Sequence, residues 1–145
     1  MSKEVSCGAI LFRESNGIRN YLLLHYESGY WDFAKGRREK GESEKETTIR
    51  EVHEETGIND LTFIDNFKKK INWFYKRGGE TIFKEVTYFL CETEIEEVKI
   101  CTEHIGYIWL NYEDAVKKAT FKDSKKLLEE AENFIKNKGP TLSFF

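Results

Sequence analysis

The chain has 145 residues and a formal net charge of −3, and its 39% hydrophobic and 34% charged residues are a balance typical of a water-soluble globular protein. This length suits a single domain over residues 1–145 and can bury a full hydrophobic core. The mild negative charge argues against a stable nucleic-acid partner and against electrostatic attraction to an anionic membrane. No apolar run approaches the roughly 20 residues that a membrane-spanning helix needs.

The three cysteines, Cys7, Cys91 and Cys101, lie far apart and form no Cys-x-x-Cys pair. Such cysteines are typical of reduced, mostly buried thiols. The first residues also lack the charged and apolar pattern of a secretory signal. Together these features predict a cytoplasmic protein.

Strands are expected at residues 4–13 and 20–26, which a turn at Ser15-Asn16-Gly17 separates. Two long strands are expected at residues 61–76 and 80–93, joined at Arg77-Gly78-Gly79, and a short strand at residues 105–110. Helices are expected at residues 113–119 and 124–137, because the second of these has apolar residues at helical spacing. The tail, residues 141–145, is apolar, and the sequence leaves open whether it docks on the core or on a partner.

An acidic helix is expected between the second and third of these strands. Ser43 followed by Glu46 is a capping-box pattern, and Gly57 suits the left-handed position that ends a helix. Ile49 and Val52 give this helix an apolar edge, which we expect to face the core. Strands interrupted by one acidic helix and followed by two more helices predict an α/β (α+β) sandwich, with a mixed sheet between helices.

The opposite face of the acidic helix carries Glu51, Glu54 and Glu55, whose spacing makes the three carboxylates project from nearly the same side. Like charges at this spacing oppose helix formation by roughly 0.2–0.5 kcal/mol per pair. Arg50 can offset part of this repulsion, and a divalent cation would offset more. Mg²⁺ prefers oxygen ligands and commonly bridges carboxylates to a substrate phosphate. The alternative is a solvated acidic face, which is a common fate of charge runs on helices.

Residues 36–58 as a whole resemble the Nudix box of the Nudix hydrolase superfamily. Gly36 is followed after five residues by Glu42, and after seven more by Arg50-Glu51-Val52-x-Glu54-Glu55-x-Gly57-Ile58. The resemblance implies a Nudix-type α/β/α sandwich with the box helix against the sheet edge. It also implies hydrolysis of a diphosphate linkage in a nucleoside diphosphate joined to another group, with Mg²⁺ or Mn²⁺ as the cofactor.

Roles for the motif residues follow from the chemistry of phosphoanhydride hydrolysis, which needs an in-line water, a base and cations. We expect Glu51, Glu54 and Glu55 to hold the metal, with a backbone carbonyl near Lys35 or Gly36 as a further ligand. Arg50 is expected to fix Glu51 or Glu54 in position, and Glu42 to brace the loop. Members of the superfamily differ in the glutamate that activates water, so the resemblance implies three candidates for the general base: Glu51, Glu54 and the downstream Glu103.

The resemblance extends beyond the box. Trp31-Asp32-Phe33-Ala34-Lys35-Gly36 is similar to the tryptophan-x-x-proline-lysine-glycine segment of the asymmetrical diadenosine tetraphosphate hydrolases. Glu103-His104-x-x-Tyr107-x-Trp109-Leu110 is similar to a later part of that group. Ala34 stands where the group usually has proline, and Arg37 where it often has histidine. Arginine can nevertheless supply a bidentate contact to phosphate.

This resemblance implies a base-stacking aromatic residue near residues 72–75 and a phosphate-contacting lysine near Lys84. Stacking on an aromatic ring contributes about 1–3 kcal/mol per base. We therefore expect Trp73 or Tyr75 to stack on a nucleobase, with Tyr107 as a second clamp. Lys35, Arg37 and Lys84 are expected to contact phosphates.

The sequence thus predicts a magnesium-dependent hydrolase of dinucleoside polyphosphates, converting diadenosine tetraphosphate (Ap4A) and water into ATP and AMP. Alternatives within the superfamily are an RNA 5′ pyrophosphohydrolase and a pyrophosphatase of nucleoside triphosphates or diphosphoinositol polyphosphates. An alternative of another class is a non-catalytic nucleotide-binding module. That alternative requires a damaged metal site, whereas every glutamate of the box is present.

Overall fold

The computed structural model describes the backbone of residues 1–142 and the side chains of residues 1–137. The docking of the apolar tail at residues 141–145 therefore lies outside the described residues. The strands are β1 (Ser2–Ser15), β2 (Ile18–Tyr26), β3 (Trp31–Asp32), β4 (Ala34–Arg37), β5 (Thr62–Arg77), β6 (Glu80–Glu92) and β7 (His104–Leu110). The helices are α1 (Glu44–Thr56), α2 (Tyr112–Lys118) and α3 (Lys122–Leu142).

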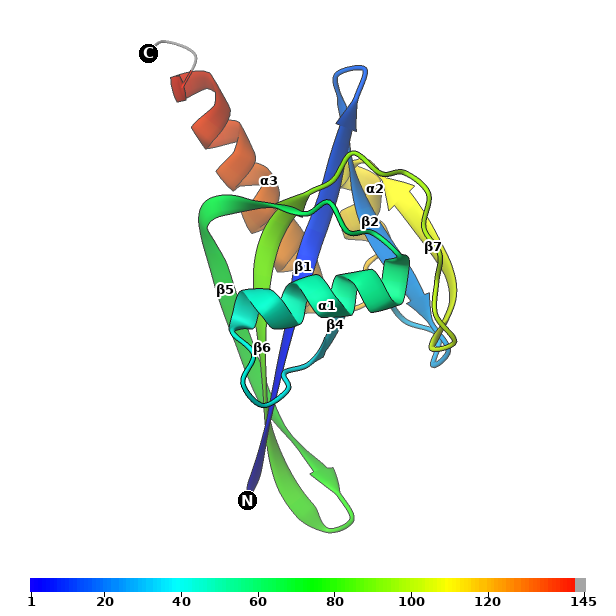
Figure 1. The fold of residues 1–145 in the computed structure, drawn as a ribbon, viewed down its shortest axis with the longest axis vertical. Helices are drawn as coiled ribbons and strands as arrows, with labels where there is room; N and C mark the ends of the chain where they lie inside the picture. Colours follow the sequence, from blue (N-terminus) through cyan, green and yellow to red (C-terminus); the bar gives the residue numbers. More distant parts are fainter. Residues whose placement is uncertain (143–145) are drawn as a thin grey trace.

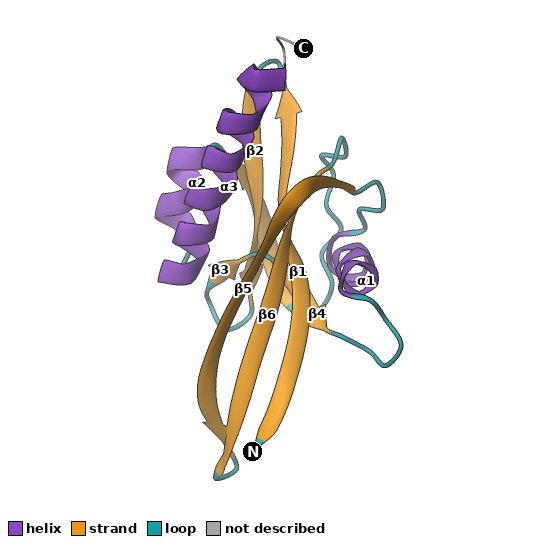
Figure 2. Cartoon of the chain, turned by 90° about the vertical axis from the view of Figure 1, so that its left-hand side faces the viewer, coloured by secondary structure: helices purple, strands orange, loops and turns teal. Residues whose placement is uncertain are grey.

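Within residues 1–142, seven strands form one mixed sheet, in which β1 and β6 run parallel. Helix α1 covers one face of the sheet, and α2 and α3 cover the other (Figure 2). This arrangement confirms the predicted sandwich of a mixed sheet between helices. No helix in the described part of the chain combines the length and apolarity needed to cross a membrane.

Strand β1 changes partner along its length. Residues Ser6–Ala9 pair with β4, residues Phe12–Ser15 pair with β2, and β6 runs along the other edge. Strand β4 comes very close to β1 at Gly8, where a Cβ atom would lie 2.3 Å from the carbonyl oxygen of Ala34. Because β4 leads into the loop before α1, this pairing fixes the start of the acidic segment. The sequence did not predict β3 and β4, which are too short to show a strand period.

The two faces of the central strands form two separate cores. Ile10 and Phe12 of β1 pack on the side of α2 and α3, whereas Ala9 and Leu11 pack on the side of α1. Strand β2 is likewise buried on both faces, since residues 22–24 alternate between these two cores.

Helix α1 begins and ends where the sequence predicts. Ser43 and Glu46 form both hydrogen bonds of the capping box, and Gly57 adopts a left-handed φ of 78°. The predicted apolar edge is wrong in part, because Val52 is fully buried while Ile49 is 47% exposed. Thr48 and Thr56 take the place expected for Ile49. Their hydroxyls donate to the carbonyls one turn back, at 2.9 and 2.6 Å, which lets them be buried without losing hydrogen bonds.

The position of α1 also differs from the expectation. The helix packs across β1 and β4 and reaches β6, so it lies over the centre of the sheet rather than against its edge (Figure 1). Val52 explains this placement, because it joins a core cluster with Ala9 and Leu11 of the central strand.

Strands β5 and β6 form a long hairpin that turns at Gly78 and Gly79, as predicted, with φ values of 59° and 80°. The pairing of β5 is interrupted by a bulge between Phe63 and Lys68. The hairpin and the start of β1 extend beyond the helices (Figures 1 and 2). Their uncovered ends are therefore free to line a binding site.

Candidate functional site

Arg50 is the centre of a network that ties α1 to the loop before it. Its guanidinium donates to Glu42 at 2.6 and 3.0 Å, to Glu51 at 2.7 Å and to the carbonyl of Arg37 at 2.9 Å. Glu54 lies 3.3 Å away. The hydrogen bond from Arg50 is the main reason that the pKa of Glu42 falls to about 2. Arg50 thus donates its hydrogen bonds to protein groups, as expected for a residue that positions carboxylates.

The three glutamates of the predicted metal site differ in their surroundings. The side chain of Glu54 is 56% exposed and that of Glu51 is 13% exposed, whereas Glu55 is buried. Glu55 accepts a hydrogen bond from the backbone N–H of Lys35 at 3.1 Å. Among the described residues, no basic side chain lies within ion-pair distance of Glu55. Burial, followed by the charge of Glu51, raises the pKa of Glu55 to about 8, and burial also raises the pKa of Glu51.

Gly36 lies directly against Glu51. A Cβ atom at residue 36 would lie 2.0 Å from the carboxyl carbon of Glu51, so only glycine leaves room for this carboxylate. The backbone of residues 35 and 36 therefore borders both Glu51 and Glu55. This is the place where the sequence predicts a carbonyl ligand beside the carboxylates.

Within the described residues, no three His, Cys, Asp or Glu side chains are arranged as a metal-ligand cluster. Arg50 draws Glu51 and Glu54 toward itself, while Glu55 bonds to β4. The site nevertheless fits a hard divalent cation, because it brings two poorly solvated carboxylates together without enough positive charge to balance them. Oxygen donors of this kind are those that Mg²⁺ and Mn²⁺ favour.

Glu103, the third candidate base, is exposed in the turn before β7. Its negative charge raises the pKa of both Glu51 and Glu55, so its carboxylate is close enough to interact with the acidic face of α1. The neighbouring His104 is buried, with Nδ1 3.3 Å from the sulfur of Cys101 and its ring edge against Tyr26. His104 is therefore part of the packing beneath the turn that carries Glu103.

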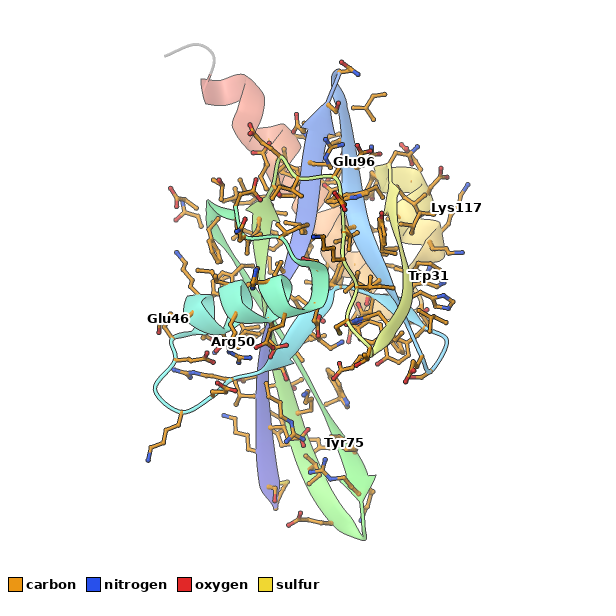
Figure 3. The ribbon with its side chains drawn as sticks, turned by 45° about the vertical axis from the view of Figure 1, so that its right-hand side comes forward. Trp31, Glu46, Arg50, Tyr75, Glu96 and Lys117 are labelled. Atoms are coloured by element: carbon orange, nitrogen blue, oxygen red, sulfur yellow. The ribbon has the colours of Figure 1, made fainter. Side chains whose placement is uncertain are left out.

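A cavity of about 540 Å³ opens on the side of the sheet that α2 and α3 cover. It brings together four of the residues predicted to bind substrate, namely Lys35, Trp73, Tyr75 and Lys84. Figure 3 shows Tyr75 on the projecting β5–β6 hairpin, apart from Arg50 on α1. The sequence predicted no binding role for the other members of the lining, which are Glu4, Tyr30, Asp32, Ile71, Tyr88, Phe121, Asp123 and Ser124.

The aromatic side chains of this pocket come from separate parts of the chain. Trp73 is 40% exposed and Phe121 is 44% exposed, although both are large and apolar. Tyr30 packs against Phe121 with ring centroids 5.2 Å apart. Open aromatic faces of this kind suit a planar ligand. Proximity in the sequence could not reveal this grouping, because Tyr30 lies in a loop, Trp73 on β5 and Phe121 just before α3.

The two lysines of the pocket are paired with neighbouring side chains. The ammonium of Lys35 lies 3.0 Å from Asp32, whose other oxygen accepts hydrogen bonds from Phe33 N–H and the Ser124 hydroxyl. Lys84 donates to the Ser6 hydroxyl at 2.7 Å, and burial lowers its pKa. Both lysines therefore line the pocket with their ammonium groups bound to protein groups rather than free in solvent.

Two predicted binding residues lie outside this pocket. Arg37 pairs with Glu4 at its margin. Tyr107 lies on β7 opposite Leu24, which faces the α1 side of the sheet, so Tyr107 is on the face away from the pocket. The expected second clamp is thus absent from the pocket lining, and Phe121 and Tyr30 accompany Trp73 instead.

Comparisons with known proteins identify the family to which this chain belongs. The NUDIX domain family model matches residues 2–131. The asymmetrical bis(5′-nucleosyl)-tetraphosphatase of Mus musculus is 34% identical over 142 residues, which cover 90% of this chain and 94% of the relative. A crystal structure of a Caenorhabditis elegans Ap4A hydrolase binary complex is similar with a TM-score of 0.81 at 28% identity, covering 92% of this chain and 98% of that one. The chain therefore belongs to the Nudix hydrolase family.

Proposed function

We propose that this chain hydrolyses a phosphoanhydride bond of a dinucleoside tetraphosphate, converting Ap4A and water into ATP and AMP with Mg²⁺ or Mn²⁺ as cofactor. The observation that carries the proposal is the position of Lys35. Its backbone N–H bonds to Glu55 at 3.1 Å, while its side chain lies in the aromatic pocket. A nucleoside held in the pocket would therefore extend its phosphates past Lys35 toward the acidic face of α1.

The metal would be held by Glu51, Glu54 and Glu55, together with a backbone carbonyl near Lys35 or Gly36. A bound divalent ion stabilises negative charge on the phosphoryl oxygens and lowers the pKa of a bound water. The buried Glu55 supports this role, because a carboxylate without a counter-ion is costly inside a protein.

The protein's own residues supply the remaining functions. Arg50 orients Glu51 and Glu54, and Glu42 holds Arg50 while accepting hydrogen bonds from Glu39 N–H at 2.9 Å and the Thr47 hydroxyl at 2.8 Å. Arg50 is thereby a positioning residue, since its donors are occupied by the protein.

The general base is one of Glu51, Glu54 and Glu103. The geometry favours Glu103, because Arg50 already binds the other two carboxylates. Glu103 forms no ion pair with any described residue, so its carboxylate is free to accept a proton from water.

Substrate binding is assigned to the pocket. Its volume lies in the range of small-molecule sites. Trp73, accompanied by Phe121 and Tyr30, would stack on one base. Lys35 and Lys84 would contact the phosphates. The similarity to asymmetrical tetraphosphatases over most of both chains supports a dinucleotide substrate.

A substrate panel with product identification tests this proposal. The purified protein is incubated with Mg²⁺ and with Ap4A, ATP, 5′-triphosphorylated RNA or a diphosphoinositol polyphosphate. ATP and AMP in equal amounts from Ap4A are the expected products, and metal chelation should abolish their formation. Two molecules of ADP would contradict asymmetrical cleavage, and turnover of RNA alone would favour the RNA pyrophosphohydrolase. Nucleotide binding without turnover of any substrate would indicate the non-catalytic module.

A further inference from the structure

Glu4 contacts side chains from three other strands at the margin of the pocket. It lies on β1, and its Oε1 accepts a hydrogen bond from the Tyr75 hydroxyl at 2.7 Å. Arg77 at the end of β5 lies 3.0 Å from Oε2, and Arg37 of β4 pairs with the same oxygen. Lys84 of β6 is 3.7 Å from Oε1. One carboxylate of β1 therefore contacts side chains from β4, β5 and β6.

The charges around Glu4 make its carboxylate necessary to the arrangement of the neighbouring cationic side chains. Three cations, Arg37, Arg77 and Lys84, surround one carboxylate, so the group keeps an excess of positive charge. The side chains of Arg37 and Arg77 are 63% and 58% exposed, whereas that of Glu4 is only 9% exposed. Without the carboxylate the cations would repel one another, and the two long arginine side chains would turn into solvent.

The carboxylate itself is not available to a ligand. Tyr75 and Lys84 occupy one oxygen, and the two arginines occupy the other. The hydrogen bond from Tyr75, followed by the nearby cations, lowers the pKa of Glu4, so the group stays ionised at neutral pH. A ligand at this margin would meet the cationic groups and the Tyr75 ring rather than the negative charge.

These cations continue the line of positive charge along the pocket. Strand register places Lys35, Arg37 and Lys84 on one face of the sheet, because they pair with Gly8, Ser6 and Glu4, which alternate along β1. That line leads from the aromatic rings toward β4, where the acidic face of α1 begins. Polyphosphate is the ligand chemistry that matches such a row of cations beside stacking rings.

We propose that Glu4 is a positioning residue of the substrate site, which holds Tyr75, Lys84, Arg37 and Arg77 in the arrangement that receives a nucleoside polyphosphate. This role rests on the nucleotide site of the proposed function. Glu4 acts before the substrate arrives, because side chains that are already ordered do not have to be immobilised on binding. It belongs to binding and not to the chemical step, since it lies on the pocket side of the sheet, away from Glu51 and Glu54.

Steady-state kinetics on Ap4A with Mg²⁺, together with calorimetric binding of the non-hydrolysable nucleotide α,β-methylene-ATP, tests this inference. Glu4→Gln keeps the shape of the side chain and an acceptor for Tyr75 but removes the charge. We expect it to raise KM and the Kd of the nucleotide by about tenfold, with kcat changed by less than twofold. Glu4→Ala should have a larger effect. Glu14→Gln is the matched control. Glu14 lies on the same strand as Glu4, and the change removes an exposed ion pair with Arg19 of β2, so both constants should stay unchanged.

Arg77→Gln provides an independent variant at the exposed end of the hairpin, in case changes at Glu4 impair folding. It should raise KM by about threefold alone and have almost no effect when added to Glu4→Gln, because both changes disrupt one cluster. A lower KM in Glu4→Gln would overturn the inference, since Glu4 would then be competing with phosphate. An unchanged KM and Kd, or a fall in kcat alone, would overturn it as well. Failure of the unchanged protein to bind the nucleotide would instead remove the proposed function together with this inference.

Discussion

Gly36 and Glu51 are in such close contact that a Cβ atom at residue 36 would lie 2.0 Å from the carboxyl carbon of Glu51. The loop and the helix of the acidic site are therefore fitted to each other at this point. Neither residue can change in size without displacing the carboxylate.

Gly36→Ala should consequently reduce turnover severely, by about 100-fold or more, because a displacement of about 1 Å in a catalytic site can cost that much. The measurement is kcat/KM on Ap4A. Gly106→Ala is the matched control, because its Cβ would meet only the Cβ of His25, at an ordinary contact distance of 3.7 Å. Equal activity of the two variants would contradict the assigned position of Glu51.

The buried carboxylate of Glu55 leads to a prediction about stability. Glu55→Gln keeps an acceptor for the Lys35 N–H but removes a carboxyl group whose pKa burial raises to about 8, so folding no longer has to bury or protonate a carboxylate there. In the absence of divalent ions, its free energy of unfolding should exceed that of the unchanged protein by about 1–3 kcal/mol. Denaturant unfolding with and without Mg²⁺ measures this.

The same variant should lose most of the stabilisation that added Mg²⁺ confers, because a ligand stabilises only the state that binds it. If Mg²⁺ raised the stability of both proteins equally, Glu55 would have no part in holding the metal.

Trp73 and Phe74 are adjacent exposed aromatics, but only Trp73 lines the pocket. Trp73→Ala should raise KM for Ap4A by about tenfold or more, since base stacking contributes about 1–3 kcal/mol. Phe74→Ala removes a more exposed ring that packs on Phe83 instead, and its KM should stay within twofold of the original. Similar KM values for the two variants would mean that the base lies elsewhere.

The pair of Glu42 and Arg50 predicts a dependence of stability on acid. The pKa of Glu42 is about 2 in the folded protein, below its usual value of 4.5, chiefly because of the hydrogen bond from Arg50. The folded state therefore favours the ionised group, and this contribution is complete above about pH 4.5 and disappears as the pH falls toward 2.

The unfolding free energies of the unchanged protein and of Glu42→Gln, measured from pH 7 to pH 2, check this dependence. Glu42→Gln should be the less stable protein at pH 7, and the difference should shrink between pH 4.5 and 2. A difference that is constant across this range would show that the charge of Glu42 does not stabilise the fold.

The parts of the fold that depend only on residues close together along the chain were predictable from the sequence. Ser43 and Glu46 lie within one turn, so their capping box does not depend on tertiary structure, and Gly57 ends the helix for an equally local reason. Ile49 was placed wrongly because hydrophobicity alone cannot reveal that buried threonines satisfy their own hydroxyls within the helix. Glu54 is exposed and Glu55 is buried because of the way α1 packs on β1 and β4. The spacing of residues along a helix cannot predict this packing.

The pocket was predictable only in part, because its lining comes from segments that are far apart in the sequence. The residues singled out on β5 and β6 share one face of a hairpin, so alternation along the strands brings Trp73, Tyr75 and Lys84 together. Glu4 and Phe121 join them through the folding of distant segments. Tyr107 is on the opposite face because its register on β2 places it beside Leu24, and that register is fixed by tertiary packing.

The measurement that tests the central claim most directly is Mn²⁺ binding, followed by electron paramagnetic resonance, in the unchanged protein and in Glu51→Gln and Glu54→Gln. The acidic face of α1 is expected to bind the ion, so each variant should weaken Mn²⁺ binding by about tenfold or more while its circular dichroism spectrum stays the same. Equal Mn²⁺ affinity in all three proteins would contradict the assignment of these carboxylates to a metal site.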